Sequence, residues 1–224
     1  MLWLRPKFVS LPLLLAIVGV NLLVPAQAAH VHSGELLVPA EWGEAHPGPY
    51  TITVAVLVDE EWVARFGADA REQAYAIVRA ADHQFEPAGI KLQPVLYETW
   101  ISKDSASNIV QLLDSLGLAH PPGDADLVVG LTAGYVGPEG GAARPRRPYV
   151  VVKHHPYHVE RDALVLAHEI AHTLGLHHHN CPDGLCLMAD HEYDPDEHWC
   201  PEHLELLRAN GGFFQYLKDA NLQA

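Results

Sequence analysis

Apolar residues in the middle of the chain alternate between short β-branched runs and longer segments with helical spacing. Residues 51–58 form a dense run rich in Val, Ile and Thr, which predicts a buried strand. Residues 69–86 predict an amphipathic helix, because apolar side chains recur there every three or four positions. Pro87 and Gly89 follow directly and end this helix. Its apolar face consists of Ala74, Ile77, Val78, Ala81 and Phe85.

Three further strands are predicted downstream. Residues 90–97 favour a strand that bends near Pro94, since proline removes one donor from the sheet ladder. Residues 126–131 and 149–153 are short, apolar and rich in valine. Between them, residues 133–148 are rich in Gly, Pro and Arg and predict a long loop or a weak edge strand.

Helical segments alternate with these strands. Residues 104–116 predict a helix that is capped at Asp104 or the next residue and closed by Gly117. Residues 162–174 predict another helix, and residues 194–210 predict the start and body of a carboxy-terminal one. The order strand–helix–strand–helix–strand is typical of an α/β (α+β) fold with a mixed, mostly parallel sheet.

The amino-terminal segment has a different pattern. Arg5 and Lys7 precede an apolar run over residues 8–24, and small residues follow up to Ala28. This arrangement predicts a secretory signal peptide over residues 1–28, cleaved after Ala28, and hence an exported protein, periplasmic or extracellular. The alternative is an uncleaved membrane anchor, since the run approaches spanning length. After cleavage, we expect no stable membrane insertion.

Composition and charge narrow the function classes. The 224 residues suit one domain with a small appendage, and 49% hydrophobic content is enough for a sizeable core. With 14 basic and 28 acidic residues the net charge is −14, which argues against nucleic-acid binding because such a chain repels phosphates. Of the 16 histidines, 11 lie between His154 and His203, and this clustering points to metal.

The densest part of that cluster has the spacing of a catalytic metal site. His168 and His172 are four residues apart, so a helix places both imidazoles on one face, where they can bind one zinc ion. Glu169 can reach a water on that zinc without being a ligand. Gly175 can end the helix through a positive φ, so that His178 folds back as a third ligand. Three protein ligands leave a fourth position open for water.

These residues match H-E-x-x-H-x-x-G-x-x-H in full, so the chain resembles the metzincin metallopeptidases. The resemblance implies hydrolysis of a peptide or protein substrate by a zinc-activated water. Zinc lowers the pKa of bound water from about 15.7 to about 7, and Glu169 would act as the catalytic general base. The order of strands and helices before the motif is also that of metzincin amino-terminal subdomains.

A second motif follows the third histidine and is similar to that of the archaemetzincins. In that family C-x4-C-x-M and a later C-x2-C pair supply four thiolates to a structural zinc. The first part is kept here as Cys181, Cys186 and Met188, whereas the final pair becomes Cys200 and His203. Three cysteines and one histidine still form an accepted structural zinc set. The resemblance also implies that Met188 lies in a Met-turn, an apolar floor beneath the three imidazoles.

The resemblance suggests a division of the chain into two subdomains after an extended lead-in over residues 29–49. Residues 50–178 would form the amino-terminal subdomain with the zinc helix. Residues 179–224 would form a small carboxy-terminal subdomain with the Met-turn and the second zinc. A rival interpretation pairs the first two cysteines in a disulfide and leaves Cys200 over, since exported thiols tend to oxidise.

Three alternatives stay open. Glu197 could replace His178 as the third ligand, as in gluzincins. The chain could also be a secreted zinc-binding or peptide-binding protein without catalysis, although such a protein needs no non-ligand glutamate beside its first histidine.

The other histidines before the zinc helix, at positions 154, 155 and 158, are expected in a solvated loop near the cleft.

Overall fold

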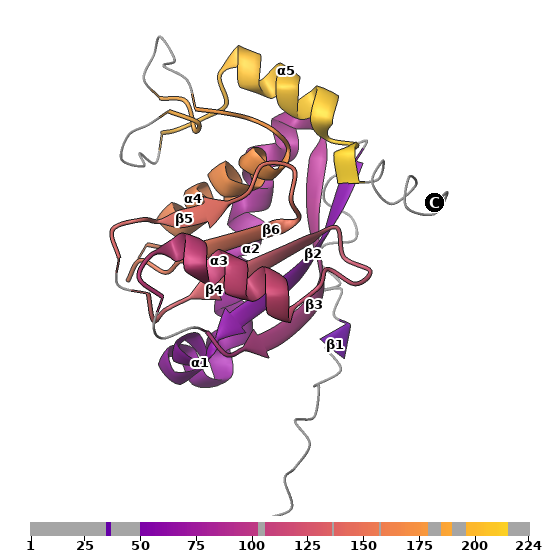
Figure 1. The fold of residues 1–224 in the computed structure, drawn as a ribbon. Coiled ribbons are helices and arrows are strands. Elements are labelled where there is room, and N and C mark those ends of the chain that lie inside the picture. Colours follow the sequence, from indigo (N-terminus) through magenta and orange to yellow (C-terminus); the bar gives the residue numbers. More distant parts are fainter. Residues whose placement is uncertain are drawn as a thin grey trace, which may run out of the picture. The chain divides into compact units, whose positions relative to one another are not determined.

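The computed structural model describes residues 35–36, 50–102, 106–135, 137–156, 158–178, 185–189 and 196–214. The predicted signal peptide, most of the lead-in and Cys181 lie outside these residues. The centre of the fold is a six-stranded sheet with the strand order β1-β3-β2-β4-β6-β5 (Figure 1).

The four inner strands run parallel to one another, and the two short edge strands are antiparallel to their neighbours. This confirms the predicted mixed, mostly parallel sheet. The segment 133–148 contributes the predicted edge strand, β5. The strands are β1 (Glu35–Leu36), β2 (Tyr50–Asp59), β3 (Ile90–Trp100), β4 (Leu127–Thr132), β5 (Gly141–Ala143) and β6 (Tyr149–Lys153).

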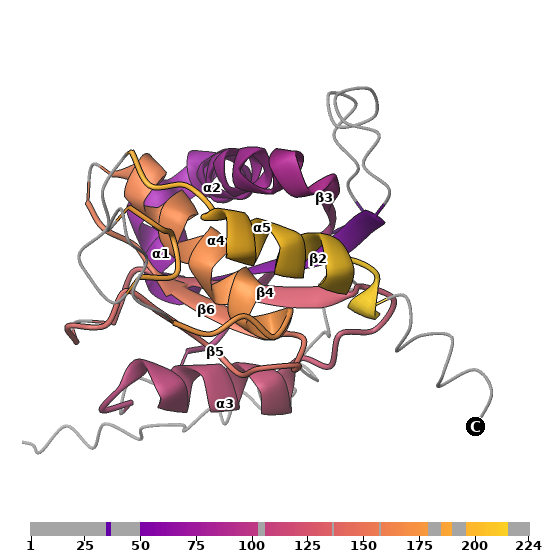
Figure 2. The ribbon, with the colours of Figure 1, turned by 90° about the horizontal axis from the view of Figure 1, so that it is seen from above.

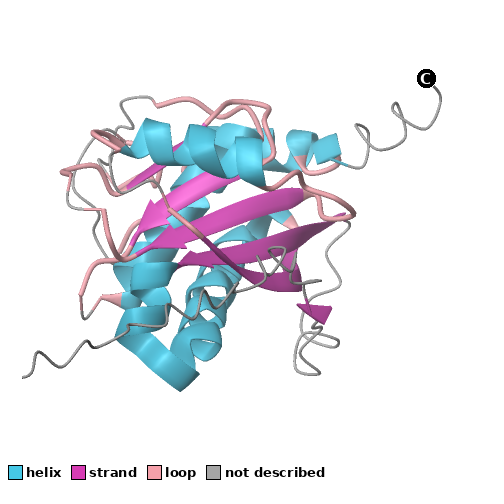
Figure 3. Ribbon diagram, turned by 60° about the horizontal axis from the view of Figure 1, so that its bottom comes forward, coloured by secondary structure: helices cyan, strands magenta, loops and turns pink. Residues whose placement is uncertain are grey.

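Helices cover both faces of the sheet, as the views from two further directions show (Figures 2 and 3). Helices α2 and α4 pack on one face, and α3 packs on the other. The helices are α1 (Glu60–Phe66), α2 (Ala70–Phe85), α3 (Ile109–Ala119), α4 (Val159–Thr173) and α5 (Pro201–Asn210), with short 3-10 turns η2 (Gly67–Asp69) and η3 (Glu86–Ala88).

The predicted bend in β3 is a β-bulge. Val54 pairs with Pro94 and Ala55 pairs with Leu96, so Val95 is an extra residue opposite β2. The proline therefore lies at the one place in the strand where the ladder is already interrupted, which explains how an inner strand tolerates it.

The prediction for α3 was wrong at both ends. The helix begins after Asn108, whose side chain accepts a hydrogen bond from the backbone N–H of Gln111 at 3.0 Å. Gly117 lies inside the helix, where an added Cβ would meet the ring of Tyr149 at an ordinary 3.7 Å. The chain leaves the helix at His120, just before two prolines.

Helix α1 was not predicted, and a buried aspartate at the end of β2 explains it. Asp59 is fully buried and caps α1 by accepting from the backbone N–H of Trp62 at 2.8 Å. The same carboxylate accepts from the backbone N–H of Ala133 at 3.2 Å. One side chain thus fixes the loops that leave two neighbouring strands.

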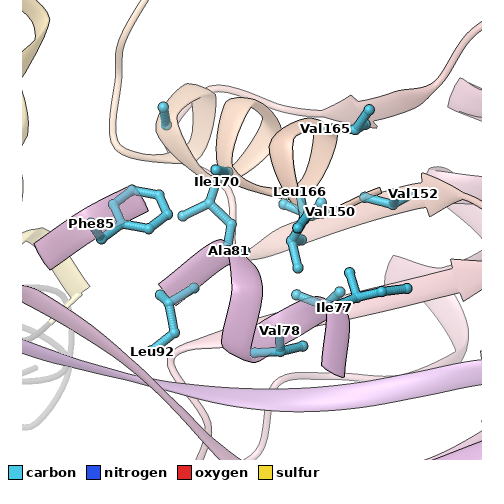
Figure 4. Close-up of a cluster of buried hydrophobic side chains, with 14 of the residues drawn as sticks. Ile77, Val78, Ala81, Phe85, Leu92, Val150, Val152, Val165, Leu166 and Ile170 are labelled. Atoms are coloured by element: carbon cyan, nitrogen blue, oxygen red, sulfur yellow. The ribbon is translucent and has the colours of Figure 1, made fainter. Parts of the chain in front are cut away.

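The interface between α2, α4 and the sheet is the part of the core that positions the zinc helix. Ile77 and Ala81 of α2 face Leu166 and Ile170 of α4, above Val150 of β6 (Figure 4). These five side chains are all at most 1% exposed. Burial of this apolar face holds α4 against the sheet more strongly than its own helical propensity could.

Replacing Ile77 with Ala should therefore destabilise the protein by about 2–5 kcal/mol, because it leaves a cavity under α4. Urea unfolding of the metal-free protein measures this loss. Leu118→Ala is the control, since Leu118 is 88% exposed and its truncation should change the free energy of unfolding by less than about 0.5 kcal/mol. Equal effects of the two variants would contradict this account of the core.

Candidate metal centre

Three histidine side chains converge at the carboxy-terminal end of α4. The Nε2 atom of His178 lies 2.9 Å from that of His168 and 3.0 Å from that of His172. The remaining Nε2 pair, between His168 and His172, is 3.1 Å apart. The structure thus brings together the three histidines that the motif predicts as ligands.

Backbone carbonyls fix the orientation of two of these rings. The Nδ1–H of His168 donates to the carbonyl of Leu187 at 2.6 Å, and the Nδ1–H of His172 donates to the carbonyl of Leu176 at 2.9 Å. Both Nε2 atoms therefore carry lone pairs, which point at one place shared with His178. Such lone pairs repel one another unless a cation lies between them.

The geometry and ionisation of the cluster fit zinc. Tetrahedral coordination with Zn–N distances of about 2.0–2.1 Å requires nitrogens about 3.3 Å apart, close to the observed spacing. Burial lowers the pKa of His168 to about 4 and also lowers the pKa of His172. His168 is therefore neutral at pH 7, and burial also favours the neutral form of His172, which is the form that binds a metal.

A glycine turn brings His178 back to the helix. Gly175 has φ +87°, and its N–H donates to the carbonyl of His172 at 3.0 Å. The N–H of Leu176 donates to the carbonyl of Ala171 at 3.0 Å, which completes a Schellman motif. This confirms that Gly175 ends the helix through a positive φ.

Glu169 lies beside the cluster in a buried position. Its side chain is 7% exposed, and burial raises its pKa to about 8 in the absence of metal. Strand β5 covers it closely, since a Cβ added to Gly141 would lie 2.7 Å from Cγ of Glu169 and 2.7 Å from Cγ1 of Val165. Only glycine at position 141 leaves room for the glutamate in this place.

The segment 185–189 forms a tight turn next to His168. The N–H of Ala189 donates to the carbonyl of Cys186 at 2.8 Å, with Leu187 and Met188 between them. Met188 is fully buried in the main core cluster. The turn is therefore present where the sequence predicts a Met-turn, and its Leu187 carbonyl holds His168.

A second potential metal cluster lies next to this turn. Cys186, Cys200 and His203 each offer a ligand atom within 4.8 Å of the others, and all three are buried. The Nδ1 atom of His203 is 3.1 Å from Sγ of Cys186 and 3.4 Å from Sγ of Cys200. The fourth predicted ligand, Cys181, lies outside the described residues.

The expectation that the histidines before α4 lie in a solvated loop was wrong for His154 and His155. His154 is only 9% exposed, and its Nδ1 atom lies 2.7 Å from Oδ2 of the fully buried Asp162. The Nδ1 atom of His155 is 2.9 Å from Oδ1 of the same carboxylate. Only His158 is exposed. Helix α4 begins at Val159, three residues before the predicted start at Asp162, so this aspartate lies in its first turn.

The converging nitrogens favour His178 over Glu197 as the third ligand. Among the described residues, the group around α4 that could hold a metal consists of three histidines and does not include Glu197. Glu197 lies instead beside the start of α5, where its side chain is 5% exposed.

Comparison with solved structures supports the same architecture. Archaemetzincin from Methanopyrus kandleri is 26% identical, with a TM-score of 0.52, over 78% of this chain and 98% of that one. A structure described as a chaperone–substrate complex is 17% identical, with a TM-score of 0.57. That match covers 74% of this chain but only 34% of the other, so it shows the fold alone.

Within the described part of the chain, no helix is both long and apolar enough to cross a bilayer.

Two comparisons of the sequence with known proteins differ in outcome. A search of curated proteins finds no match. The model of metallo-peptidase family M12 matches residues 48–213, which include every strand from β2 onward and the whole three-histidine motif. The chain therefore belongs to metallopeptidase family M12 and has a metzincin-like zinc metallopeptidase fold.

Proposed function

We propose that this protein hydrolyses peptide bonds with a zinc ion held by His168, His172 and His178, and with Glu169 as general base. The observation that carries the proposal is the convergence of three imidazole nitrogens beside a buried, non-ligand carboxylate. A protein that only stores or buffers zinc does not require such a carboxylate, so the geometry favours catalysis.

The chain's own residues supply most of the mechanism. Zinc at this site would polarise the substrate carbonyl and lower the pKa of water to about 7. Glu169 would remove a proton from the attacking water and then pass it to the leaving amine. Its burial favours this role, because a poorly solvated carboxylate holds a proton more readily than an exposed one.

Strand β5 is suited to orient the substrate. It is the last strand of the sheet, pairs with β6 on one side, and passes directly over Glu169. An extended peptide could add to its outer edge through backbone hydrogen bonds. The scissile bond would then lie close to both the glutamate and the three histidines.

We further propose a structural zinc held by Cys181, Cys186, Cys200 and His203. The convergence of the last three side chains in a buried position supports it, and Cys200 and His203 lie at the start of α5. A metal there would join α5 to the turn at Met188. The disulfide alternative does not account for the approach of both Cys186 and Cys200 to one imidazole nitrogen.

Export stays a prediction from the sequence. It is supported by the basic start, the apolar run and the small residues before Ala28. The division at residue 178 into two subdomains is likewise a proposal from the family resemblance.

Replacing Glu169 with Gln should reduce peptidase kcat by about 10²–10⁴-fold, because the amide cannot accept the proton. Zinc content should be unchanged, since Glu169 is not a ligand. Turnover of an unstructured peptide mixture and zinc per chain are the two measurements. Glu205→Gln, on the exposed side of α5, is the control and should be fully active. Activity retained in the Glu169 variant would exclude the proposed base.

Gly141→Ala should lower kcat by on the order of 10- to 100-fold, because the new methyl displaces Glu169 or β5 from the observed position. Zinc content is expected to stay at the wild-type level. Gly117→Ala is the matched control, since the same methyl meets only ordinary contacts inside α3. A fully active Gly141 variant would show that the close approach of β5 is not needed.

The purified mature protein should contain two zinc ions per chain and three free thiols after denaturation with a chelator. His178→Ala should remove one zinc and leave the other, since the histidine belongs to only one cluster. Metal analysis and a thiol assay on the same sample test both statements. One zinc and a disulfide in the wild type would refute the second site but keep the peptidase.

A further inference from the structure

Hydrogen bonds to backbone carbonyls link the two clusters. One cluster consists of the three histidines and the other of Cys186, Cys200 and His203. The carbonyl of Leu187, the residue after Cys186, accepts from Nδ1 of His168 at 2.6 Å. In the opposite direction, the carbonyl of His177, the residue before His178, is 3.0 Å from Nε2 of His203. Each cluster therefore holds the backbone next to a ligand of the other.

His203 occupies this position with both of its ring nitrogens. Its Nδ1 atom faces the two sulfurs, and its Nε2–H donates to the His177 carbonyl on the other side of the ring. The side chain is only 1% exposed, so neither nitrogen has water as an easy substitute. A cysteine at this position could supply a metal ligand but could not donate the second hydrogen bond.

His178 is the ligand that depends most on such support. His168 and His172 lie on α4, which the core holds rigidly against the sheet. His178 lies beyond the end of the helix, and both His177 and His178 are exposed. The hydrogen bond from His203 acts on the peptide unit that joins these two residues, and it therefore restrains the third ligand directly.

We propose that His203 is a positioning residue for the catalytic zinc, linking occupancy of the cysteine cluster to the affinity of the three-histidine site. The proposal rests on the zinc sites proposed above. A metal on Nδ1 would make the opposite N–H a stronger, charge-assisted donor, so filling the cysteine cluster would tighten the hold on His178. By linkage, zinc at the histidines would raise metal affinity at the cysteines by the same factor.

Two substitutions separate the role of the ligand from that of the donor. His203→Cys keeps a metal ligand but removes the donor, whereas His203→Gln keeps an N–H near the same place but removes the ligand. Chelator competition measures zinc affinity at the three-histidine site. Cobalt substitution reports the cysteine cluster separately, because only thiolate ligands give sulfur-to-metal charge-transfer absorption.

We expect His203→Cys to retain the cysteine-cluster metal and to weaken zinc at the three-histidine site by about 10- to 100-fold. His203→Gln should weaken the cysteine-cluster metal. It should also weaken the three-histidine site, but less than His203→Cys does, because it keeps an N–H donor and loses only the charge assistance of the metal. If the second metal acted only by holding α5 in place, His203→Gln would weaken zinc binding at the three-histidine site more than His203→Cys does. That reversed order, or unchanged affinity in both variants, would overturn the proposal.

His83→Cys is the matched control, because it makes the same substitution on an exposed histidine at the end of α2, outside both clusters. It should leave both affinities at the wild-type value. A failure of the peptidase proposal itself would be seen in the wild-type protein, which would then bind no zinc at the three histidines. A failure of the His203 proposal alone would be seen only in the comparison of the two variants.

Discussion

The convergence of three imidazole nitrogens within 3.1 Å is the constraint on which the rest of the site depends. Lone pairs at this spacing repel, so the arrangement is stable only around a cation or under restraint from the surrounding structure. The restraint comes from several levels at once. The core fixes α4, the glycine turn reverses the chain, and the carbonyls of Leu176 and Leu187 orient two of the rings. Each of these contributions is small in free energy, and together they define one position for a metal.

Burial of this site has a cost that a bound metal would offset. Eleven of the 15 residues of α4 are buried, including His168 and Glu169, which must be desolvated together with the apolar face. Desolvation raises the pKa of Glu169 to about 8 and lowers that of His168 to about 4, so both groups resist their charged forms without metal. A divalent cation would stabilise the ionised form of the Glu169 carboxylate and would accept the lone pairs of the neutral imidazoles. Metal binding and folding should therefore be coupled in this region.

The sequence predicts those features that follow from spacing, and it misses those that depend on backbone acceptors or distant partners. Helical periodicity and the position of Gly175 were sufficient to place the three histidines. The carbonyls of Leu176 and Leu187 carry no signal, because every residue has a carbonyl and only the fold determines which one faces an imidazole. The pairing of His154 with Asp162 was also missed, since a histidine-rich loop is normally solvated. Helix α1 escaped prediction because its cap, Asp59, reads as the polar end of a strand.

The contrast between α4 and α5 explains why a histidine at position 203 matters. Helix α5 buries only His203 and Leu207, so hydrophobic contact alone gives it little hold on the rest of the protein. Polar links replace that contact. Asn210 donates to the carbonyl of Leu174 at 2.7 Å, beside the glycine turn, and His203 donates to the carbonyl of His177 just beyond it. These two bonds from α5 end on the segment that carries the third ligand, and a further one, from Arg208, ends on the carbonyl of Pro87. The two hydrogen bonds from Asn210 and His203 stabilise the candidate metal site and α5 together, so a substitution that breaks either bond should affect both.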